Sequence, residues 1–284
     1  MGERIIPLEH LGRVFQRHFE VVRADTPLLL DDALRLRYQV YCRENNYEHP
    51  GSFADGREFD NFDLFSVHSY VKHLESSLTA ANVRLILPRK GDRQFHFPIQ
   101  DYVDNELIQA HCEWKSGDIN ETAEISRFCV SREFKHRRGE EQTISGAVEQ
   151  FEFPLGAPEE LHLIKYMSRV ERNSYHSANG RLLPHITLGL FAAIFEMSAE
   201  EGIKHWFALM EPSLLKLLKR FGIEFSCIGD PIEHRGLRQP CYALIDDVAL
   251  GIWEKRPDIW RFITKNGEVW PLPETETSKI FSAL

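Results

Sequence analysis

The residues of this chain whose types could support chemistry form an ordered trail of charged and aromatic side chains. The trail begins at Arg37 and passes through Tyr41 and Tyr47 before it reaches three further groups: Glu58, Asp60 and Asp63; Arg84; and Glu124 with Arg127. Several of these charges stand among apolar, strand-like residues, where burial is costly unless each charge is paired. Charged residues that are spread over separate segments but converge in space indicate a site rather than a core.

Helices and strands predicted from apolar periodicity must position this trail. Helices are expected over residues 10–19, 33–41, 183–201, 213–221 and 248–262. Strands are expected over residues 19–24, 66–74, 80–88, 123–130, 204–210, 225–228 and 241–245, and the second and third of these resemble an antiparallel hairpin. Residues 47–65 are rich in Gly, Asp, Asn and Phe without any period, so we expect them to form a loop that wraps around something.

The bulk composition indicates an ordinary globular protein. The 284 residues, 43% hydrophobic and 27% charged, favour one enlarged domain over residues 1–284, with an uneven, charged insertion at about 135–182 that includes a mobile part. A formal net charge of -9 argues against nucleic acid as a partner. No apolar run approaches the roughly 20 residues that span a bilayer. The first residues lack the apolar core of a secretory signal, and five widely spaced cysteines fit reduced thiols, so a cytoplasmic location is expected.

Residues 132–139 form a dense basic patch on this acidic chain. The patch contains Arg132, Lys135, Arg137 and Arg138, with Gly139 as its only glycine. Two interpretations stay open. The patch is either a solvated loop, or a site for an anion such as phosphate or for an acidic partner protein.

Several other kinds of site are not expected. The thirteen histidines show no H-E-x-x-H spacing and no Cys/His cluster, so no metal centre is predicted. The chain also lacks a G-x-S-x-G elbow, a Walker loop and a dinucleotide fingerprint, which leaves serine hydrolase and nucleotide chemistry without support.

The order and spacing of the trail resemble those of the acyl-homoserine-lactone synthases, the autoinducer synthases built on the GNAT-type acyltransferase fold. In that family an Arg is followed by aromatic residues four and ten positions later, then by two Asp three apart, an Arg-Leu strand and a Glu-x-x-Arg pair. The matching positions here are Arg37, Tyr41, Tyr47, Asp60, Asp63, Arg84, Glu124 and Arg127. The two aromatic positions are typically Phe and Trp in the synthases but are both Tyr here, so a lactone product is not implied. The chain looks closer to N-acyl amino acid synthases and to acyltransferases associated with exosortase/PEP-CTERM systems. The second of these groups shares the sequence of residues 36–41 and 124–128.

The resemblance implies an α+β GNAT fold, in which helices flank a mixed, mostly antiparallel central sheet and two central strands splay into a V. It places these two strands at 124–130 and 204–210, with the pantetheine arm of an acyl thioester between them. Backbone N–H groups freed by the splay would face the thioester carbonyl as its oxyanion develops. The residues expected to bind the acyl donor are Phe128, Val130, Arg132, Lys135, Arg137, Arg138, Gly139 and Phe207. An apolar tunnel for the acyl tail could use Phe128, Leu190, Phe191, Ile194 and Phe207, but these residues also fit an ordinary core.

The resemblance also implies roles in the chemistry. Glu124 is the candidate general base, acting directly or through a water, because burial in a strand can raise its pKa to a useful value. Simple alternation puts Arg127 on the opposite strand face, which fits an anchor for the Asp60 loop better than a part in the chemistry, unless a bulge reverses it. Arg37 would orient the acceptor or stabilise an N-terminal lid, and it completes the expected catalytic set. Tyr41, Tyr47, Asp60, Asp63 and Arg84 would form the acceptor-binding loop network, or alternatively a buried ion network with a purely structural role.

The resulting expectation is a cytoplasmic N-acyltransferase without a tightly bound cofactor. It would move a medium or long acyl group from acyl carrier protein or acyl-CoA to the amine of a small, amino acid-like acceptor, by direct attack. Acyl carrier protein is the expected protein partner. Two alternatives stay open: an N-acetyltransferase that uses acetyl-CoA, which the single glycine after residue 130 disfavours, and a non-catalytic acyl-thioester sensor.

Overall fold

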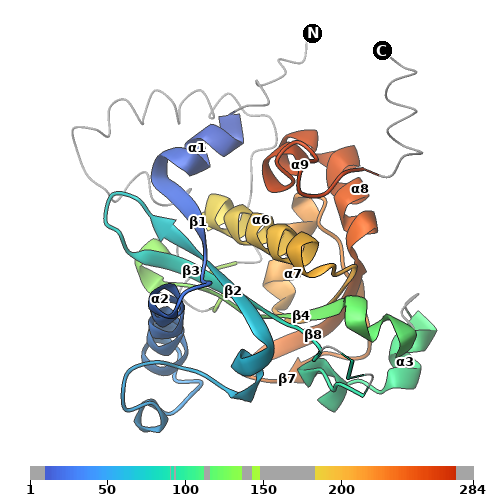
Figure 1. Cartoon of the computed structure of the whole chain (residues 1–284), viewed down its shortest axis with the longest axis horizontal. Helices are drawn as coiled ribbons and strands as arrows, with labels where there is room; N and C mark the ends of the chain where they lie inside the picture. Colours follow the sequence, from blue (N-terminus) through green and yellow to red (C-terminus); the bar gives the residue numbers. More distant parts are fainter. Residues whose placement is uncertain are drawn as a thin grey trace.

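The computed structural model describes residues 10–89, 91–92, 94–111, 116–135, 143–147 and 183–272. Within these residues an open sheet runs in the order β1-β2-β3-β4-β5-β8-β6, and β7 pairs with β8 (Figure 1). Its strands are β1 (Phe19–Arg23), β2 (Ser66–His73), β3 (Thr79–Ile86), β4 (Thr122–Val130), β5 (His205–Met210), β6 (Ser226–Cys227), β7 (Ile232–Glu233) and β8 (Leu237–Leu244). Strands β4 and β5 pair in parallel, whereas the other pairs are antiparallel. The expected mixed, mostly antiparallel sheet is therefore confirmed.

Helices flank the sheet, as expected. They are α1 (His10–His18), α2 (Pro27–Tyr38), α3 (Asn105–His111), α6 (Leu183–Glu201), α7 (Pro212–Arg220), α8 (Ile245–Lys255) and α9 (Pro257–Ile263). Short 3₁₀ turns cover Pro50–Ser52, Asn61–Phe65, Pro98–Asp101, Ser116–Glu121 and Arg132–Phe134, and a π-helical turn, Gln39–Glu44, extends α2. In Figure 1, α6 crosses in front of the sheet near α1, α8 and α9. Among the described residues, no helix has both the length and the apolar composition that crossing a membrane requires.

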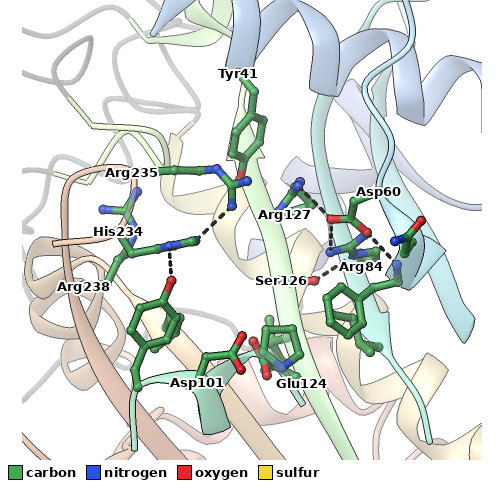
Figure 2. A pocket seen from close by; sticks show the side chains of 17 residues that line it. Tyr41, Asp60, Arg84, Asp101, Glu124, Ser126, Arg127, His234, Arg235 and Arg238 are labelled. Carbon is green, nitrogen blue, oxygen red and sulfur yellow. Dashed lines mark hydrogen bonds and ion pairs between the residues drawn. The ribbon is translucent and has the colours of Figure 1, made fainter. Parts of the chain in front are cut away.

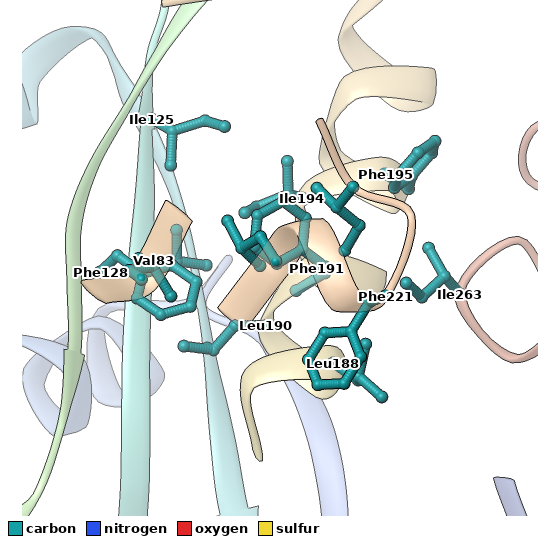
Figure 3. Packing of buried hydrophobic residues seen from close by; sticks show 14 of the residues in the cluster. Val83, Ile125, Phe128, Leu188, Leu190, Phe191, Ile194, Phe195, Phe221 and Ile263 are labelled. Carbon is teal, nitrogen blue, oxygen red and sulfur yellow. The ribbon is translucent and has the colours of Figure 1, made fainter. Parts of the chain in front are cut away.

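The main hydrophobic core lies between the sheet and α6. Because side chains alternate along a strand, Val83 and Leu85 of β3 and Ile125 of β4 point to this face. Figure 3 shows Phe128 beside Phe191, with a ring-centroid distance of 5.9 Å. The residues considered for an acyl tunnel on this face, Phe128, Leu190, Phe191 and Ile194, are all packed in this core. A second apolar cluster on the opposite face contains Ile86, Phe97, Phe207 and Tyr242.

Most of the predicted elements occur near their expected positions, with three corrections. Helix α2 begins at Pro27, not at residue 33, because Thr26 caps it and accepts a hydrogen bond from the Leu29 N–H at 3.3 Å. The prediction of one helix over residues 248–262 is wrong: α8 and α9 are separate, because Pro257 starts a new helix. Helix α3 and the two-residue strand β7 were not expected from the sequence.

The expected V-shaped parting of two central strands has a counterpart in the pairing of β4 and β5. Their parallel pairs run from Thr122 opposite His205 to Ile125 opposite Ala208, where the pairing ends. Both strands continue, β4 to Val130 and β5 to Met210. The ends of the two strands are therefore unpaired with each other beyond Ile125 and Ala208.

Candidate active site

A pocket opens beside this parting, on the sheet face opposite α6. Its volume is about 340 Å³. It is lined by Tyr41, Asp60, Asn61, Phe62, Arg84, Ile86, Pro98, Asp101, Tyr102, Glu124, Ile125, Ser126, Arg127, Leu209, His234, Arg235 and Arg238. Figure 2 shows Glu124 on one side of this space, Asp60 with Arg84 on a second side, and His234 with Arg235 on a third. Acidic and basic side chains therefore face the same small pocket.

A cluster of six alternating charges forms one wall, and we call it the carboxylate–guanidinium cluster. Its acids, Glu58, Asp60 and Asp63, come from the loop before β2, whereas its bases, Arg37, Arg84 and Arg127, come from α2, β3 and β4. Arg84 Nη1 donates to Asp60 Oδ1 and to Asp63 Oδ1, both at 2.7 Å. Three positive and three negative charges balance, so the convergence expected from the sequence trail is confirmed as geometry.

Glu58 is the centre of the buried half of this cluster. Its carboxylate accepts from Arg37 Nε at 2.6 Å and from Arg127 Nη2 at 2.8 Å. Burial alone would raise the pKa of Glu58, but the two guanidinium groups outweigh burial and lower it to about 2. Asp63, which accepts from Arg37 Nη1 at 2.7 Å, also has a lowered pKa because Arg37 and Arg84 outweigh its burial. The acids of the cluster are therefore ionised at neutral pH and hold the loop against the sheet.

Arg127 lies on the pocket face, as expected if β4 carries a bulge, and not on the opposite face that simple alternation predicts. The register of β3 and β4 shifts between the pairs Arg84–Ser126 and Asn82–Cys129, which leaves one extra residue on β4. Arg127 has a φ of 51° there, the left-handed backbone of a bulge. The extra residue puts Arg127 on the same face as Glu124 and Ser126, and its guanidinium lies 5.0 Å from the centroid of the Tyr41 ring. Its contacts to Asp60 support the expected anchoring of the loop.

Two acids of the pocket stand outside the cluster: Asp101, which is exposed, and Glu124, which is buried. Glu124 comes from the paired part of β4, opposite Phe207, and is 2% exposed. Its Oε2 accepts from the Ile99 N–H at 2.9 Å. Burial raises the pKa of Glu124 to about 8, and the bond from Ile99 only partly opposes this. A carboxyl with such a pKa can take up and release a proton near neutral pH.

The wall opposite the cluster is built by the β7–β8 turn and the loop before α3. Arg235 Nη1 donates to His234 Nε2 at 2.9 Å, so the neutral His234 ring presents Nδ1–H to the Tyr102 hydroxyl at 2.7 Å. The pKa of His234 is lowered to about 4, first by burial and then by Arg235, which keeps the ring neutral at pH 7. Arg235 Nε also donates to Glu48 at 2.7 Å. Arg238, 7% exposed, has its nearest carboxylate, Glu211, at 3.7 Å.

The remaining expected acceptor-side residues lie at or near the pocket. Tyr41 lines it and is buried, and burial raises the pKa of its hydroxyl. Tyr47 packs behind Tyr41 at a ring-centroid distance of 6.4 Å and does not line the pocket. Arg37 is fully buried in the cluster and does not line the pocket either. The contacts of Arg37 fit the holding of a loop better than the binding of an acceptor.

The residues expected to bind the acyl donor are scattered, and none of those described lines the pocket. Phe128 packs in the main core and Phe207 in the second cluster. The Val130 N–H donates to the Ile144 carbonyl at 3.0 Å, and Lys135 Nζ, 3% exposed, donates to the Thr143 carbonyl at 2.8 Å. Arg132 is exposed and donates to the Glu44 carbonyl at 2.9 Å. Arg137, Arg138 and Gly139 lie outside the described residues, as does most of the expected insertion.

Sequence reasoning missed several residues of the pocket. Glu58 belonged to the trail but was not proposed as a site residue, although a buried partner for two arginines was needed. Asp101 ends a proline-containing 3₁₀ turn and Tyr102 follows it, in a segment without apolar periodicity. His234 and Arg235 follow the two-residue strand β7, which is too short to give a periodic signal, and Arg238 lies near the start of β8. The dense charge of residues 233–238 was the available clue.

Comparisons with known proteins give one family match. Residues 36–145 match the family described as "Acetyltransferase (GNAT) domain". The matched segment contains the whole trail and the wall of the pocket that carries Glu124. The prediction of a GNAT-like fold and of an acyltransferase is confirmed at this level. No curated protein matches the chain.

Solved structures of low identity were also found. TofI, crystallised in a ternary complex with an inhibitor and MTA, has 17% identity, coverage of 85% of this chain and 99% of that chain, and a TM-score of 0.49. The CoA-dependent synthase BjaI has 18% identity, coverage of 85% and 89%, and a TM-score of 0.47. FeeM, an N-acyl amino acid synthase from uncultured soil microbes, has 13% identity, coverage of 82% and 93%, and a TM-score of 0.46.

Proposed function

We propose that this protein is an N-acyltransferase that moves a medium or long acyl group from a thioester donor to the amine of a small, amino acid-like acceptor. The observation that carries the proposal is the position of Glu124. This buried carboxyl, with a pKa raised to about 8, faces a pocket at the point where β4 and β5 stop pairing. The GNAT match over residues 36–145 supports acyl transfer as the class of reaction.

The mechanism follows from what an amide-forming reaction needs. The acceptor amine is protonated in water, and it must lose a proton before or during its attack on the thioester carbonyl. The Glu124 carboxylate takes that proton, directly or through one water, while Ile99 holds its Oε2 in a fixed position. As the amide forms, the C–S bond of the thioester breaks and the second proton of the amine passes to the leaving sulfur, so the donor leaves as its thiol. No covalent intermediate on the protein is required.

The charge pattern of the pocket suits an acceptor with a carboxylate. The carboxylate–guanidinium cluster is neutral as a whole, so its arginines are already occupied by acids. On the opposite wall Arg235 pairs with Glu48, whereas the buried Arg238 has its nearest carboxylate at 3.7 Å, so Arg238 is the guanidinium best placed to take a further carboxylate. An amino acid would place its carboxylate toward that wall and its amine toward Glu124. Tyr102 and His234 line the pocket, and the Tyr102 hydroxyl lies 2.7 Å from His234 Nδ1.

The donor is proposed to reach the pocket along the unpaired ends of β4 and β5. Both acyl carrier protein and CoA present a pantetheine arm, and the basic residues Arg132, Arg137 and Arg138 suit the acidic surface of the carrier or the phosphates of CoA, whereas Lys135 is buried. We favour acyl carrier protein as the partner, in the cytoplasm. The amino-acid sequence of residues 36–41 and 124–128 favours a role in an exosortase-associated system.

Thiol release with product analysis tests this proposal. Purified protein is given decanoyl-acyl carrier protein, decanoyl-CoA or acetyl-CoA, with either leucine or isoamylamine, which lacks the carboxylate. We expect N-decanoyl-leucine as the product, and a rate about 10²- to 10⁴-fold lower for Glu124→Gln. Glu106→Gln, an exposed acid on α3, is the matched control and should retain the full rate.

Other outcomes would contradict specific parts of the proposal. Equal rates for wild type and Glu124→Gln would remove Glu124 as the base. Equal use of isoamylamine would remove the carboxylate from the acceptor. Turnover of acetyl-CoA alone would replace the long-chain donor. Tight binding of decanoyl thioesters without turnover over hours would indicate a sensor.

A further inference from the structure

A short segment lies at the open ends of β4 and β5, and we call residues 143–147 the strap. It is buried: Ile144 is 4% exposed, Ser145 1% and Ala147 1%. On one side the Ile144 carbonyl accepts from the Val130 N–H, at the last residue of β4, at 3.0 Å. On the other side the strap binds Glu211, the residue that directly follows β5. The strap therefore bridges the two strand ends that no longer pair with each other.

The geometry of β4 shows which edge the strap covers. Successive peptide N–H groups of a strand point to opposite sides. The Ser131 N–H donates to the Ala80 carbonyl of β3 at 2.9 Å, so the N–H of the preceding residue, Val130, points away from β3. That is the edge on which β5 lies earlier along the strand. The strap thus satisfies the edge that the parting of the strands exposes.

Glu211 holds the strap by three hydrogen bonds. Its carboxylate accepts from the Ile144 N–H at 2.8 Å, from the Ser145 N–H at 3.1 Å and from the Ser145 hydroxyl. Lys135 adds a bond from its Nζ to the Thr143 carbonyl at 2.8 Å. Charged partners make these hydrogen bonds stronger than neutral ones. The apolar side chain of Ile144 packs in a cluster with Leu36, Val40, Tyr41 and Cys129.

We infer that the strap is an internal competitor of the acyl donor: it occupies the slot between the ends of β4 and β5, and donor binding displaces it. This inference rests on the proposed function, because it is the thioester arm that must enter the slot. A pantetheine arm carries amide groups of its own, which can take over the N–H of Val130. Tyr41 belongs both to the Ile144 cluster and to the pocket lining, so displacing Ile144 opens space that adjoins the pocket.

Displacement leaves no buried carboxylate without a partner. An uncompensated buried charge would be strongly destabilising. Glu211, however, lies 3.7 Å from Arg238 Nη1 while it holds the strap, so a cation stays beside its carboxylate when the strap leaves. The strap, either seated on Glu211 or released from it, is therefore the two-state element that a ligand can bias. With the strap in place, the apparent affinity for the donor is reduced by the fraction of molecules in which the slot is closed.

Hydrogen exchange of the full chain, read by mass spectrometry, tests this inference without any need for turnover. The probe is S-decanoyl-pantetheine, added without acceptor. We expect the Ile144 and Ser145 amides to exchange at least tenfold faster when the probe is bound. We also expect Ile144→Ala to lower the apparent Kd of the probe at least threefold, measured by calorimetry. Ile259→Ala, an equally buried isoleucine of α9, is the matched control and should leave that Kd unchanged.

The outcomes separate this inference from the proposed function. If the probe binds and the two amides keep their protection, the strap is a fixed part of the fold and the inference fails, while acyl transfer stands. An unchanged or higher Kd for Ile144→Ala has the same meaning. If Ile144→Ala does not fold, Ser145→Ala, which loses only the hydroxyl bond to Glu211, should lower the Kd in the same direction. If neither wild type nor variants bind the probe, the inference and the proposed function fall together.

Discussion

Replacing Glu124 by glutamine should change how the stability of the protein depends on pH. Folding raises the pKa of this carboxyl from its ordinary value of 4.5 to about 8, chiefly through burial. Between these two values the folded state keeps the proton and the unfolded state releases it. Unfolding is therefore favoured as pH rises, so Glu124 makes the wild type progressively less stable from pH 4.5 to about pH 8.

The size of the effect follows from the shift in pKa. Each pH unit between the two values costs about 1.4 kcal/mol. At pH 6 the cost of the buried carboxyl is about 2 kcal/mol, and at pH 9 it has reached its limit of roughly 5 kcal/mol. Glutamine has the same shape, keeps an oxygen to accept the Ile99 N–H and carries no charge at either pH. The stability advantage of Glu124→Gln should therefore grow by about 3 kcal/mol from pH 6 to pH 9.

Urea denaturation of both proteins at pH 6, 7, 8 and 9 measures this growth. Subtracting the two curves cancels every other titrating group, so only the Glu124 contribution remains. A difference that stays constant across this range would refute the claim that the buried carboxyl is protonated at neutral pH. It would also remove the reason to expect that kcat/KM rises with pH up to about 8, as it should for a base with this pKa.

Two further predictions concern the wall of the pocket and the core. Glu58→Gln should cost about 3–5 kcal/mol in urea denaturation at pH 7, because Arg37 and Arg127 lose a shared buried partner. The difference in unfolding free energy from wild type should shrink as pH falls from 4.5 towards 2, because the stabilisation from the lowered pKa of Glu58 is complete above pH 4.5 and is lost as the carboxylate takes up a proton. A difference that does not change with pH would contradict this. Phe191→Ala removes a fully buried ring that packs on Phe128, and it should lower the free energy of unfolding by about 3–5 kcal/mol. The kcat of the molecules that stay folded should be unchanged, and a loss of kcat would indicate that Phe191 contacts the acyl tail.

The fold was largely predictable from the sequence because apolar periodicity marks long elements. Helix α6 was located to its end residues, and β2 with β3 was predicted as a hairpin. The periodic signal fails for short or interrupted elements. Strand β7 has two residues, and its pairing with β8 depends on a turn rather than on its own pattern. The break between α8 and α9 was missed although Pro257 was visible.

The sequence indicated which residues belong to the site better than it indicated how they are arranged. The trail contained all six charges that meet in the carboxylate–guanidinium cluster, although Glu58 was not proposed as a site residue, because buried charges need partners wherever they stand. Simple alternation predicted the wrong face for Arg127, and the bulge that was kept open as an alternative is present, since one extra residue inverts every alternation argument beyond it. The strap at the strand ends could not be predicted either. Its contacts join residues that are far apart in the chain, and residue spacing alone carries no sign of them.

The architecture of the carboxylate–guanidinium cluster has a consequence for the order of folding. One loop of six residues supplies all three acids, whereas the three bases arrive from a helix and two strands that are separated by up to 90 positions (37 to 127). The bases come together only once α2, β3 and β4 have assembled, and contacts of such long range form late because closing the intervening chain costs entropy. Catalytic competence should therefore be the last property that a refolding molecule regains, after its secondary structure and most of its compactness have returned.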